Sequence, residues 1–169
     1  MNNNLIFKNI VRFIALVALQ VAVFNHINLF GFINPLIYIS WIFLFPIRKN
    51  ISLFLIFSFL LGLSVDFFSD SGGINASATL FIAFIRLPIL KAILKKSDFD
   101  YILFNLRGIS FLKAFYFISI LAIFHHFIVF SLAYFSFQEF LSIVRNTFFT
   151  SIFSIIIIIL GMALFTKKK

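Results

Sequence analysis

The sequence sets a few charged and ionisable residues inside long apolar runs, and these residue types are the ones that could do chemistry. The stretch GLSVDFFSDSGGINASATLFIAFIRLP, residues 62–88, holds two aspartates, two adjacent glycines and an arginine. His125 and His126 stand side by side in a later apolar run. Carboxylates and imidazoles are common metal ligands, so a carboxylate of the first stretch and one histidine could together hold a metal ion.

The spacing of these residues does not favour that metal site. Adjacent residues of a helix point about 100° apart, so His125 and His126 are poorly placed to bind one ion. No spacing resembles a ligand motif such as HExxH, and no nucleophile elbow, phosphate loop or paired-carboxylate site is present. The chain has no cysteine, which excludes thiolate chemistry. We therefore expect no enzyme, no metal and no cofactor, and we interpret the two histidines as hydrogen-bonded residues between helices.

Composition indicates that the elements carrying these residues lie in a membrane. The 169 residues are 63% hydrophobic and 11% charged, with a mean hydropathy of +1.15, whereas soluble domains carry roughly 25% charged residues. Uncharged stretches recur at about the 17–25 residues that a hydrocarbon core of about 30 Å requires of a helix. The first apolar run continues past Ala18 without a small-x-small cleavage site, which favours an uncleaved first helix.

Six apolar runs predict six transmembrane helices in one all-α polytopic membrane domain, residues 1–169, because backbone groups that face lipid need partners within their own segment. The predicted spans are 9–25, 34–47, 51–68, 75–94, 111–135 and 145–165. Twelve of the fourteen basic residues fall on one side of this topology and none falls in the opposite loops. The asymmetry predicts a cytoplasmic N-terminus and C-terminus. It also explains the net charge of +9 by membrane topology and by attraction to anionic membrane lipids, without nucleic acid.

The third and fourth predicted spans form a hairpin with small residues along both helices. Ser58, Gly62 and Asp66 are spaced i, i+4, i+8 and share one stripe, and small residues at this spacing let membrane helices approach closely. The facing arc on the fourth span comprises Ala76, Thr79, Ala83 and Arg86.

The two charges of the hairpin are predicted to lie at different depths. Asp66 falls in the outer third of the membrane and Arg86 near mid-depth, so we do not expect a direct ion pair between them. At its depth Asp66 is either an interfacial residue near water or a residue that contacts a ligand. Arg86 must face protein or water, and Pro88 frees the Phe84 carbonyl as one candidate partner.

The connections are predicted to be turns and caps. Asp70 and the glycines up to Gly73 form the hairpin turn, and Asn75 caps the fourth helix. Glu139 and Arg145 are expected to pair at the last outer turn. The polar stretch over 95–113 is a candidate contact for a cytoplasmic partner.

One stretch resembles a known family. Gly62-Leu63-x2-Asp66, a short turn, Gly73-x2-Ala76 and an apolar helix resemble the signature of the MreD family, the rod shape-determining membrane proteins of bacteria. The length, the basic N-terminus, the Asn34-Pro35 start of the second span, the long fifth span and the basic C-terminal tail agree with it. The four motif positions carry over, whereas Arg86, His125 and His126 rest on the residues alone as intramembrane polar candidates.

The resemblance implies a non-enzymatic scaffold of the bacterial cytoplasmic membrane. Such a subunit binds MreC directly and acts in one assembly with MreB filaments, a polymerising glycosyltransferase and a transpeptidase, to build the lateral cell wall. We expect Asp66 and Arg86 to fix the register of the helices, and an exposed surface to receive the transmembrane helix of MreC.

The same resemblance supplies an alternative function. The helical arrangement of the family is similar to that of the substrate-binding subunits of energy-coupling-factor vitamin transporters. A solute-binding membrane subunit would have an outward cavity lined by polar groups. The residues available for such a lining are Asn25, His26, Asn28, Asn75, His125 and His126.

Overall fold

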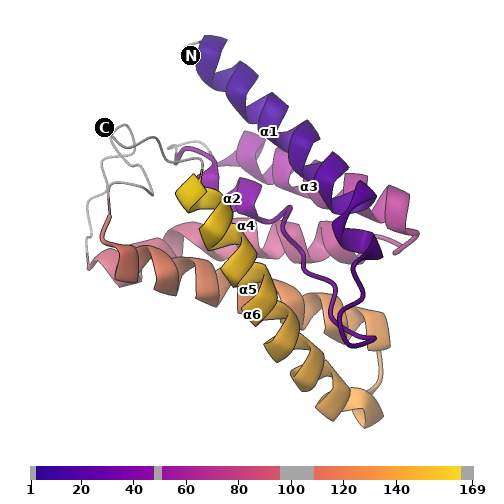
Figure 1. Ribbon diagram of the computed structural model, residues 1–169. Helices are drawn as coiled ribbons and strands as arrows, with labels where there is room; N and C mark the ends of the chain where they lie inside the picture. Colours follow the sequence, from indigo (N-terminus) through magenta and orange to yellow (C-terminus); the bar gives the residue numbers. More distant parts are fainter. Residues whose placement is uncertain (1–2, 48–50, 96–108, 165–169) are drawn as a thin grey trace.

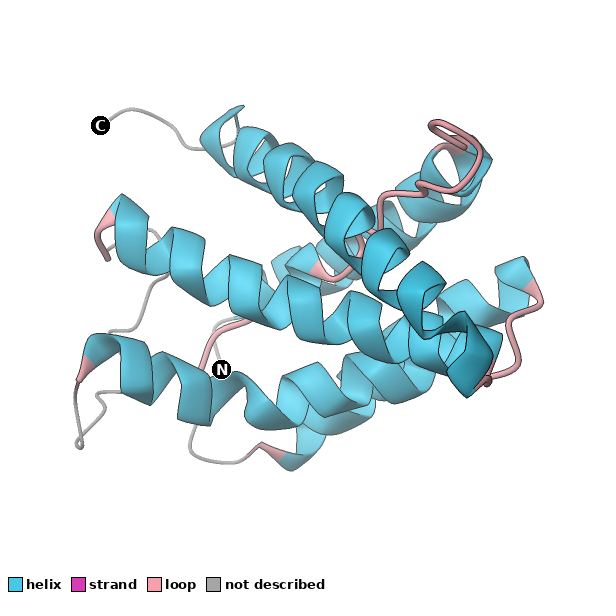
Figure 2. Cartoon of the chain, turned by 90° about the horizontal axis from the view of Figure 1, so that it is seen from below, coloured by secondary structure: helices cyan, strands magenta, loops and turns pink. Residues whose placement is uncertain are grey.

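A computed structural model of the chain describes residues 3–47, 51–95 and 109–164. These residues form helices and loops, with a single isolated β-bridge between Leu29 and Ile33 among them (Figure 2). The elements in chain order are α1 (Asn3–Ala22), η1 (Phe24–His26), α2 (Ser40–Leu44), α3 (Ser52–Ser69), α4 (Ile74–Leu94), α5 (Phe111–Tyr134), η3 (Phe137–Glu139) and α6 (Phe140–Leu164). Most of the 95–113 stretch, from residue 96 to residue 108, lies outside the described residues.

The structure confirms an all-α polytopic membrane protein. Five helical segments, those containing α1, α3, α4, α5 and α6, are long and apolar enough to cross a membrane. The helices α3, α4 and α5 match their predicted spans within one residue at each end. The first and last helices begin earlier than expected, and α6 includes Arg145 as a helical residue rather than a residue at its edge.

The second predicted span is not a continuous transmembrane helix. Only Ser40–Leu44 is helical within 34–47, and the backbone before it is irregular. The segment is nevertheless among the most deeply buried in the protein, since Tyr38, Ile39 and Ile42 have no exposed surface. Irregular backbone at membrane depth is tolerated where protein rather than lipid surrounds it. Apolar composition therefore indicated that this segment is removed from water, but it could not tell burial in protein from exposure to lipid.

Side chains of other helices satisfy the irregular backbone of the second segment. Gln20 of α1 donates to the Pro35 carbonyl at 3.2 Å and accepts from the amides of Ile37 at 2.8 Å and Tyr38 at 3.4 Å. Ser154 of α6 accepts from the Leu36 amide at 2.9 Å. These bonds replace the helical ladder, and Gln20 and Ser154 are themselves fully buried. Gln20 of α1 and Ser154 of α6 thus hold the backbone of the second segment in place.

The helices α1, α3 and α5 run in one direction, and α4 and α6 run in the opposite direction. The starts of α1, α3 and α5 lie at the same end as the last turns of α4 and α6, toward the upper left of Figure 1. The second segment runs along α4, because Tyr38 contacts Asn75 while Phe43 and Phe45 contact Arg86, eleven residues and about 16 Å further along that helix.

The outermost helix is α1. Of its most apolar 18 residues 17% are buried, against 33% for each of the other four long segments. In Figure 1, α1 diverges from the remaining helices toward its N-terminus. The core is therefore built by α3 to α6 around the second segment, and α1 keeps most of its surface available to lipid or to a partner.

Candidate functional site: a polar network at the α3–α4 hairpin

The backbones of α3 and α4 touch at Gly62. A Cβ atom on Gly62 would lie 2.5 Å from the Cα atom and 2.6 Å from the amide nitrogen of Ala76, far inside any real contact distance. Ser58, one turn earlier on the same stripe, is fully buried and donates to the Phe54 carbonyl at 2.7 Å. On α4, Thr79 and Ala83 are buried as well. The two small-residue stripes therefore lie inside the protein, and they meet where Gly62 faces Ala76.

Asp66 of α3 caps the first turn of α4. Its Oδ1 atom accepts from the Asn75 amide at 2.9 Å, the Asn75 side chain at 3.0 Å and the Ser71 hydroxyl at 2.5 Å, and its Oδ2 atom accepts from the Ala76 amide at 2.7 Å. A carboxylate there satisfies amides that lack helical partners and complements the positive end of the helix. Asp66 is 4% exposed, so it is not the interfacial residue near water that its calculated depth allowed.

The expectation that Asn75 caps α4 is wrong. The residue before the helix is Gly73, in a left-handed conformation with φ of 91°, and Asn75 lies inside the first turn. Asn75 is instead a link, because its side chain donates to Asp66 and Ser71 and its Oδ1 atom accepts from the Tyr38 hydroxyl at 2.9 Å. Asp70 ends α3 with a left-handed φ of 51°, in keeping with a turn residue.

Tyr38 connects the hairpin to α5. Its hydroxyl lies 2.9 Å from Nε2 of His125 and 2.9 Å from Oδ1 of Asn75. An amide oxygen accepts only, so Tyr38 donates to Asn75, and His125 must donate its Nε2 proton to Tyr38. A directed chain of hydrogen bonds therefore runs from His125 through Tyr38 and Asn75 to the Asp66 carboxylate. The role of Tyr38 was not predicted from the sequence, because the residue stands in an apolar run. The one available signal was its hydroxyl group, which needs a hydrogen-bond partner when it is buried among Ile and Leu side chains.

The two histidines face different elements, as their adjacent positions on α5 predicted. His126 lies 2.5 Å from the Ala122 carbonyl through Nδ1 and 3.1 Å from the Ser154 hydroxyl through Nε2. Nδ1 must carry the proton, since a carbonyl only accepts. Both rings are fully buried. In the described part of the chain no group of three or more His, Cys, Asp or Glu side chains could hold a metal ion.

Arg86 contacts the second segment rather than the Phe84 carbonyl that Pro88 frees. Its guanidinium donates through Nη2 to the carbonyls of Phe43, at 3.4 Å, and Phe45. It also lies over the Phe54 ring, 4.9 Å from the centroid. Because Phe43 and Phe45 stand at the end of α2, Arg86 satisfies carbonyls that a five-residue helix leaves unpaired. Asp66 thus accepts hydrogen bonds at the start of α4, and Arg86 donates hydrogen bonds at the end of α2.

The expected pair of Glu139 and Arg145 is replaced by other contacts. Glu139 accepts from the Ser142 hydroxyl at 2.7 Å. Arg145 donates to the Asn146 side chain at 3.3 Å and lies over the Phe32 ring, 4.7 Å from its centroid. An earlier start of α6 puts Arg145 within the helix, which turns its side chain toward the loop after α1.

Two hollows on the described surface bear on the candidate functions. A groove of about 380 Å³ between α1 and α3 has mostly apolar walls and includes Ile10, Phe13, Trp41, Phe57 and Leu60. A second hollow, of about 430 Å³, lies beside the start of α4. Of the six residues proposed for a solute cavity, Asn25, His26 and Asn75 line this second hollow, joined by Asn34 and Ser69, while Asn28, His125 and His126 do not.

No family model, no curated protein and no solved structure matches this chain.

We expect Tyr38→Phe to destabilise the protein by about 2 kcal/mol, because a buried acceptor on Asn75 and a buried donor on His125 both lose their partner. Reversible unfolding in a titration of sodium dodecyl sulfate measures the difference. Tyr116→Phe is the matched control, since the Tyr116 side chain is 51% exposed, and we expect it to leave the unfolding midpoint unchanged. Equal midpoints for the two variants would contradict the network.

Proposed function

We propose that this chain is a non-enzymatic scaffold subunit of the bacterial cell-wall elongation machinery, placed in the cytoplasmic membrane and in direct contact with MreC. MreB filaments, the polymerising glycosyltransferase and the transpeptidase belong to the same assembly. The resemblance of the Gly62–Ala76 stretch to the MreD family is the source of the proposal.

One observation carries the non-enzymatic part of the proposal. Every hydrogen bond of the Asp66 carboxylate goes to the hairpin itself, and Gly62 and Ala76 are in backbone contact. The motif residues therefore build a rigid element and leave no reactive group facing a cavity. A scaffold needs this kind of rigidity, whereas a catalytic carboxylate needs access to a substrate.

The α1–α3 groove is the surface we assign to the MreC transmembrane helix. Gly62 and Asp66 lie between α3 and α4, so they cannot touch a partner directly. We therefore place the docking surface at α1, the long helix with the smallest buried share. Exposed apolar side chains from both α1 and α3, among them Ile10 and Phe57, form the walls of the groove. Helices associate in membranes chiefly through such close van der Waals packing.

We expect Ile10→Trp, which fills the groove, to lower recovery of MreC in affinity purification from native membranes by about tenfold. Ile156→Trp on α6 is the matched control, because Ile156 is exposed to a similar extent, 50% against 48%. Equal recovery of MreC with both variants would count against the groove, and absence of MreC from the wild-type sample would count against the scaffold.

The second candidate function is a solute-binding membrane subunit. The observation in its favour is the hollow of about 430 Å³, which is lined by Asn25 and His26 of η1, by Asn34 and by Asn75 of α4. Amide and imidazole groups of this kind fix the orientation of a small polar ligand. The same purification separates the two functions, since recovery of an ATPase module in place of MreC would support the solute-binding subunit.

A further inference from the structure

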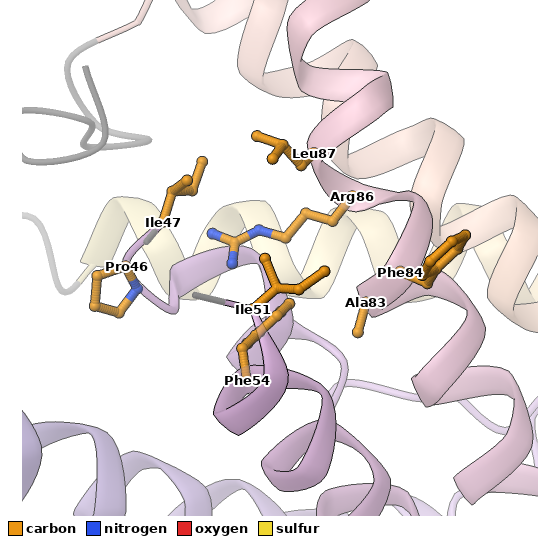
Figure 3. Close-up of a pocket in the computed structure, with 8 residues that line it drawn as sticks. All are labelled: Pro46, Ile47, Ile51, Phe54, Ala83, Phe84, Arg86 and Leu87. Atoms are coloured by element: carbon orange, nitrogen blue, oxygen red, sulfur yellow. The ribbon is translucent and has the colours of Figure 1, made fainter. Parts of the chain in front are cut away.

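Arg86 brings a positive charge into a small apolar pocket toward the opposite end of the hairpin from the Asp66 cap. The pocket is lined by Pro46, Ile47, Ile51, Phe54, Ala83, Phe84, Arg86 and Leu87. Figure 3 shows the Arg86 side chain leaving α4 and crossing the pocket toward Pro46 and Ile47. The residue is 3% exposed, although its guanidinium is a permanent cation.

The contacts of Arg86 leave its charge without a counterion among the described residues. Nη2 donates to two backbone carbonyls, and Nε, which is buried, has no hydrogen-bond partner. The acidic residues that the structure describes, Asp66, Asp70 and Glu139, stand where α3 ends and α6 begins, at the other end of the helices. A buried cation with an unused donor is unfavourable unless an anion accompanies it.

The walls and size of the pocket indicate what kind of anion fits. Phe84 is 63% exposed and Ile51 is 40% exposed, so the mouth of the pocket opens toward lipid between apolar side chains. The interior measures about 30 Å³, which is room for one or two oxygen atoms and not for a whole headgroup. An anion that enters must therefore present one or two oxygens to the guanidinium and keep the rest of its mass outside, against apolar surface.

We propose that this pocket binds the phosphate group of an anionic phospholipid, with the acyl chains lying along the exposed apolar side chains at its mouth. The Arg86 guanidinium lies over Phe54, in the first turn of α3, so it stands closer to a membrane surface than the mid-depth that its position on α4 predicted. Lys91 follows Arg86 on α4 toward the end that the basic residues predict to be cytoplasmic. Basic residues there raise the local concentration of anionic lipid. The guanidinium suits phosphate because its planar donors match phosphate oxygens. The proposal does not depend on the scaffold function.

Native mass spectrometry of the full chain, purified with a mixture of phosphatidylglycerol and phosphatidylcholine, tests the site. We expect the wild-type protein to retain phosphatidylglycerol in preference to phosphatidylcholine, and Arg86→Gln to weaken that retention by about tenfold through loss of a charge-assisted hydrogen bond. Lys113→Gln removes an exposed charge near the start of α5 and is expected to leave retention unchanged. Equal losses in the two variants would reveal general attraction to positive charge and overturn the site.

A second variant keeps the test valid if Arg86→Gln fails to fold. Ile51→Trp fills the mouth of the pocket, leaves Arg86 and its carbonyl partners in place, and is expected to weaken retention of phosphatidylglycerol to the same extent. Retention unaffected by Ile51→Trp would overturn the proposal. Displacement of the lipid by millimolar inorganic phosphate would also overturn it, because the pocket would then serve a soluble anion. None of these outcomes bears on the recovery of MreC, so the two proposals fail separately.

Discussion

Replacing Gly62 with alanine is expected to lower the free energy of unfolding by about 3 kcal/mol, although the change adds a single methyl group. The added Cβ atom would lie 2.5 Å from the Cα atom of Ala76, and this neighbour is backbone rather than the flexible end of a side chain. The helices α3 and α4 must therefore move apart. Separation lengthens the bonds from Asp66 to the amides of Asn75 and Ala76, so the steric effect also weakens the cap.

Gly161→Ala is the matched control for this prediction. Gly161 lies in α6, and a Cβ atom there meets nothing within 4 Å. The same chemical change is thus made in a long apolar helix with space available, and alanine favours a helix over glycine by about 1 kcal/mol. We expect the dodecyl sulfate unfolding midpoint to fall for Gly62→Ala and to stay level or rise for Gly161→Ala. If the midpoints of both variants changed in the same direction, the lack of space at Gly62 would not be the cause of the effect.

The hairpin shows which parts of the fold the sequence could predict. The stripe of Ser58, Gly62 and Asp66 follows from helical spacing alone, because residues four apart share a face whatever surrounds the helix. The bounds of α3 and α4 followed from polar breaks in the apolar sequence, which are basic residues before α3 and after α4 and the aspartate and glycine turn between them. These inferences rest on local chemistry, which the surrounding fold did not override.

The second segment shows why the remainder could not be predicted. Its apolar residues satisfy the same composition rule as a membrane helix, yet its amides are held by Gln20 and Ser154, which lie 17 and 118 residues away from the amides of Ile37 and Leu36. No local pattern encodes a partner at that separation. The partners of Tyr38 and Arg86 could not be predicted for the same reason. A buried hydroxyl or guanidinium needs hydrogen-bond partners, but the sequence does not show which residues these are.

The polar network also changes the interpretation of the histidines and the aspartate. In the sequence, a carboxylate and one histidine could together hold a metal ion, although their spacing does not favour such a site. Seen in the structure, His125 and Asp66 are two ends of one hydrogen-bond chain through Tyr38 and Asn75, and the chain joins α5, the second segment, α3 and α4. Its position makes it a device that sets the relative placement of these four elements.

Asp66→Asn is expected to destabilise the protein by about 3 kcal/mol, although the side chain keeps its size. The carboxylate accepts four hydrogen bonds from donors on two sides, and an amide in its place turns a donor toward at least one of those donors. A buried amide of α4 then loses its partner, and the negative charge at the start of the helix is lost as well.

Asp70→Asn distinguishes this capping role from a general effect of removing negative charge. Asp70 lies four residues along the chain, is exposed, and has a left-handed backbone conformation that asparagine also adopts readily. We expect the free energy of unfolding of Asp70→Asn to stay within about 0.5 kcal/mol of the wild-type value. If both variants lost stability equally, the charge of the hairpin tip would matter more than its hydrogen bonds. A loss confined to Asp66→Asn would show that the Asp66 carboxylate acts as a structural cap, which holds the start of α4 against α3.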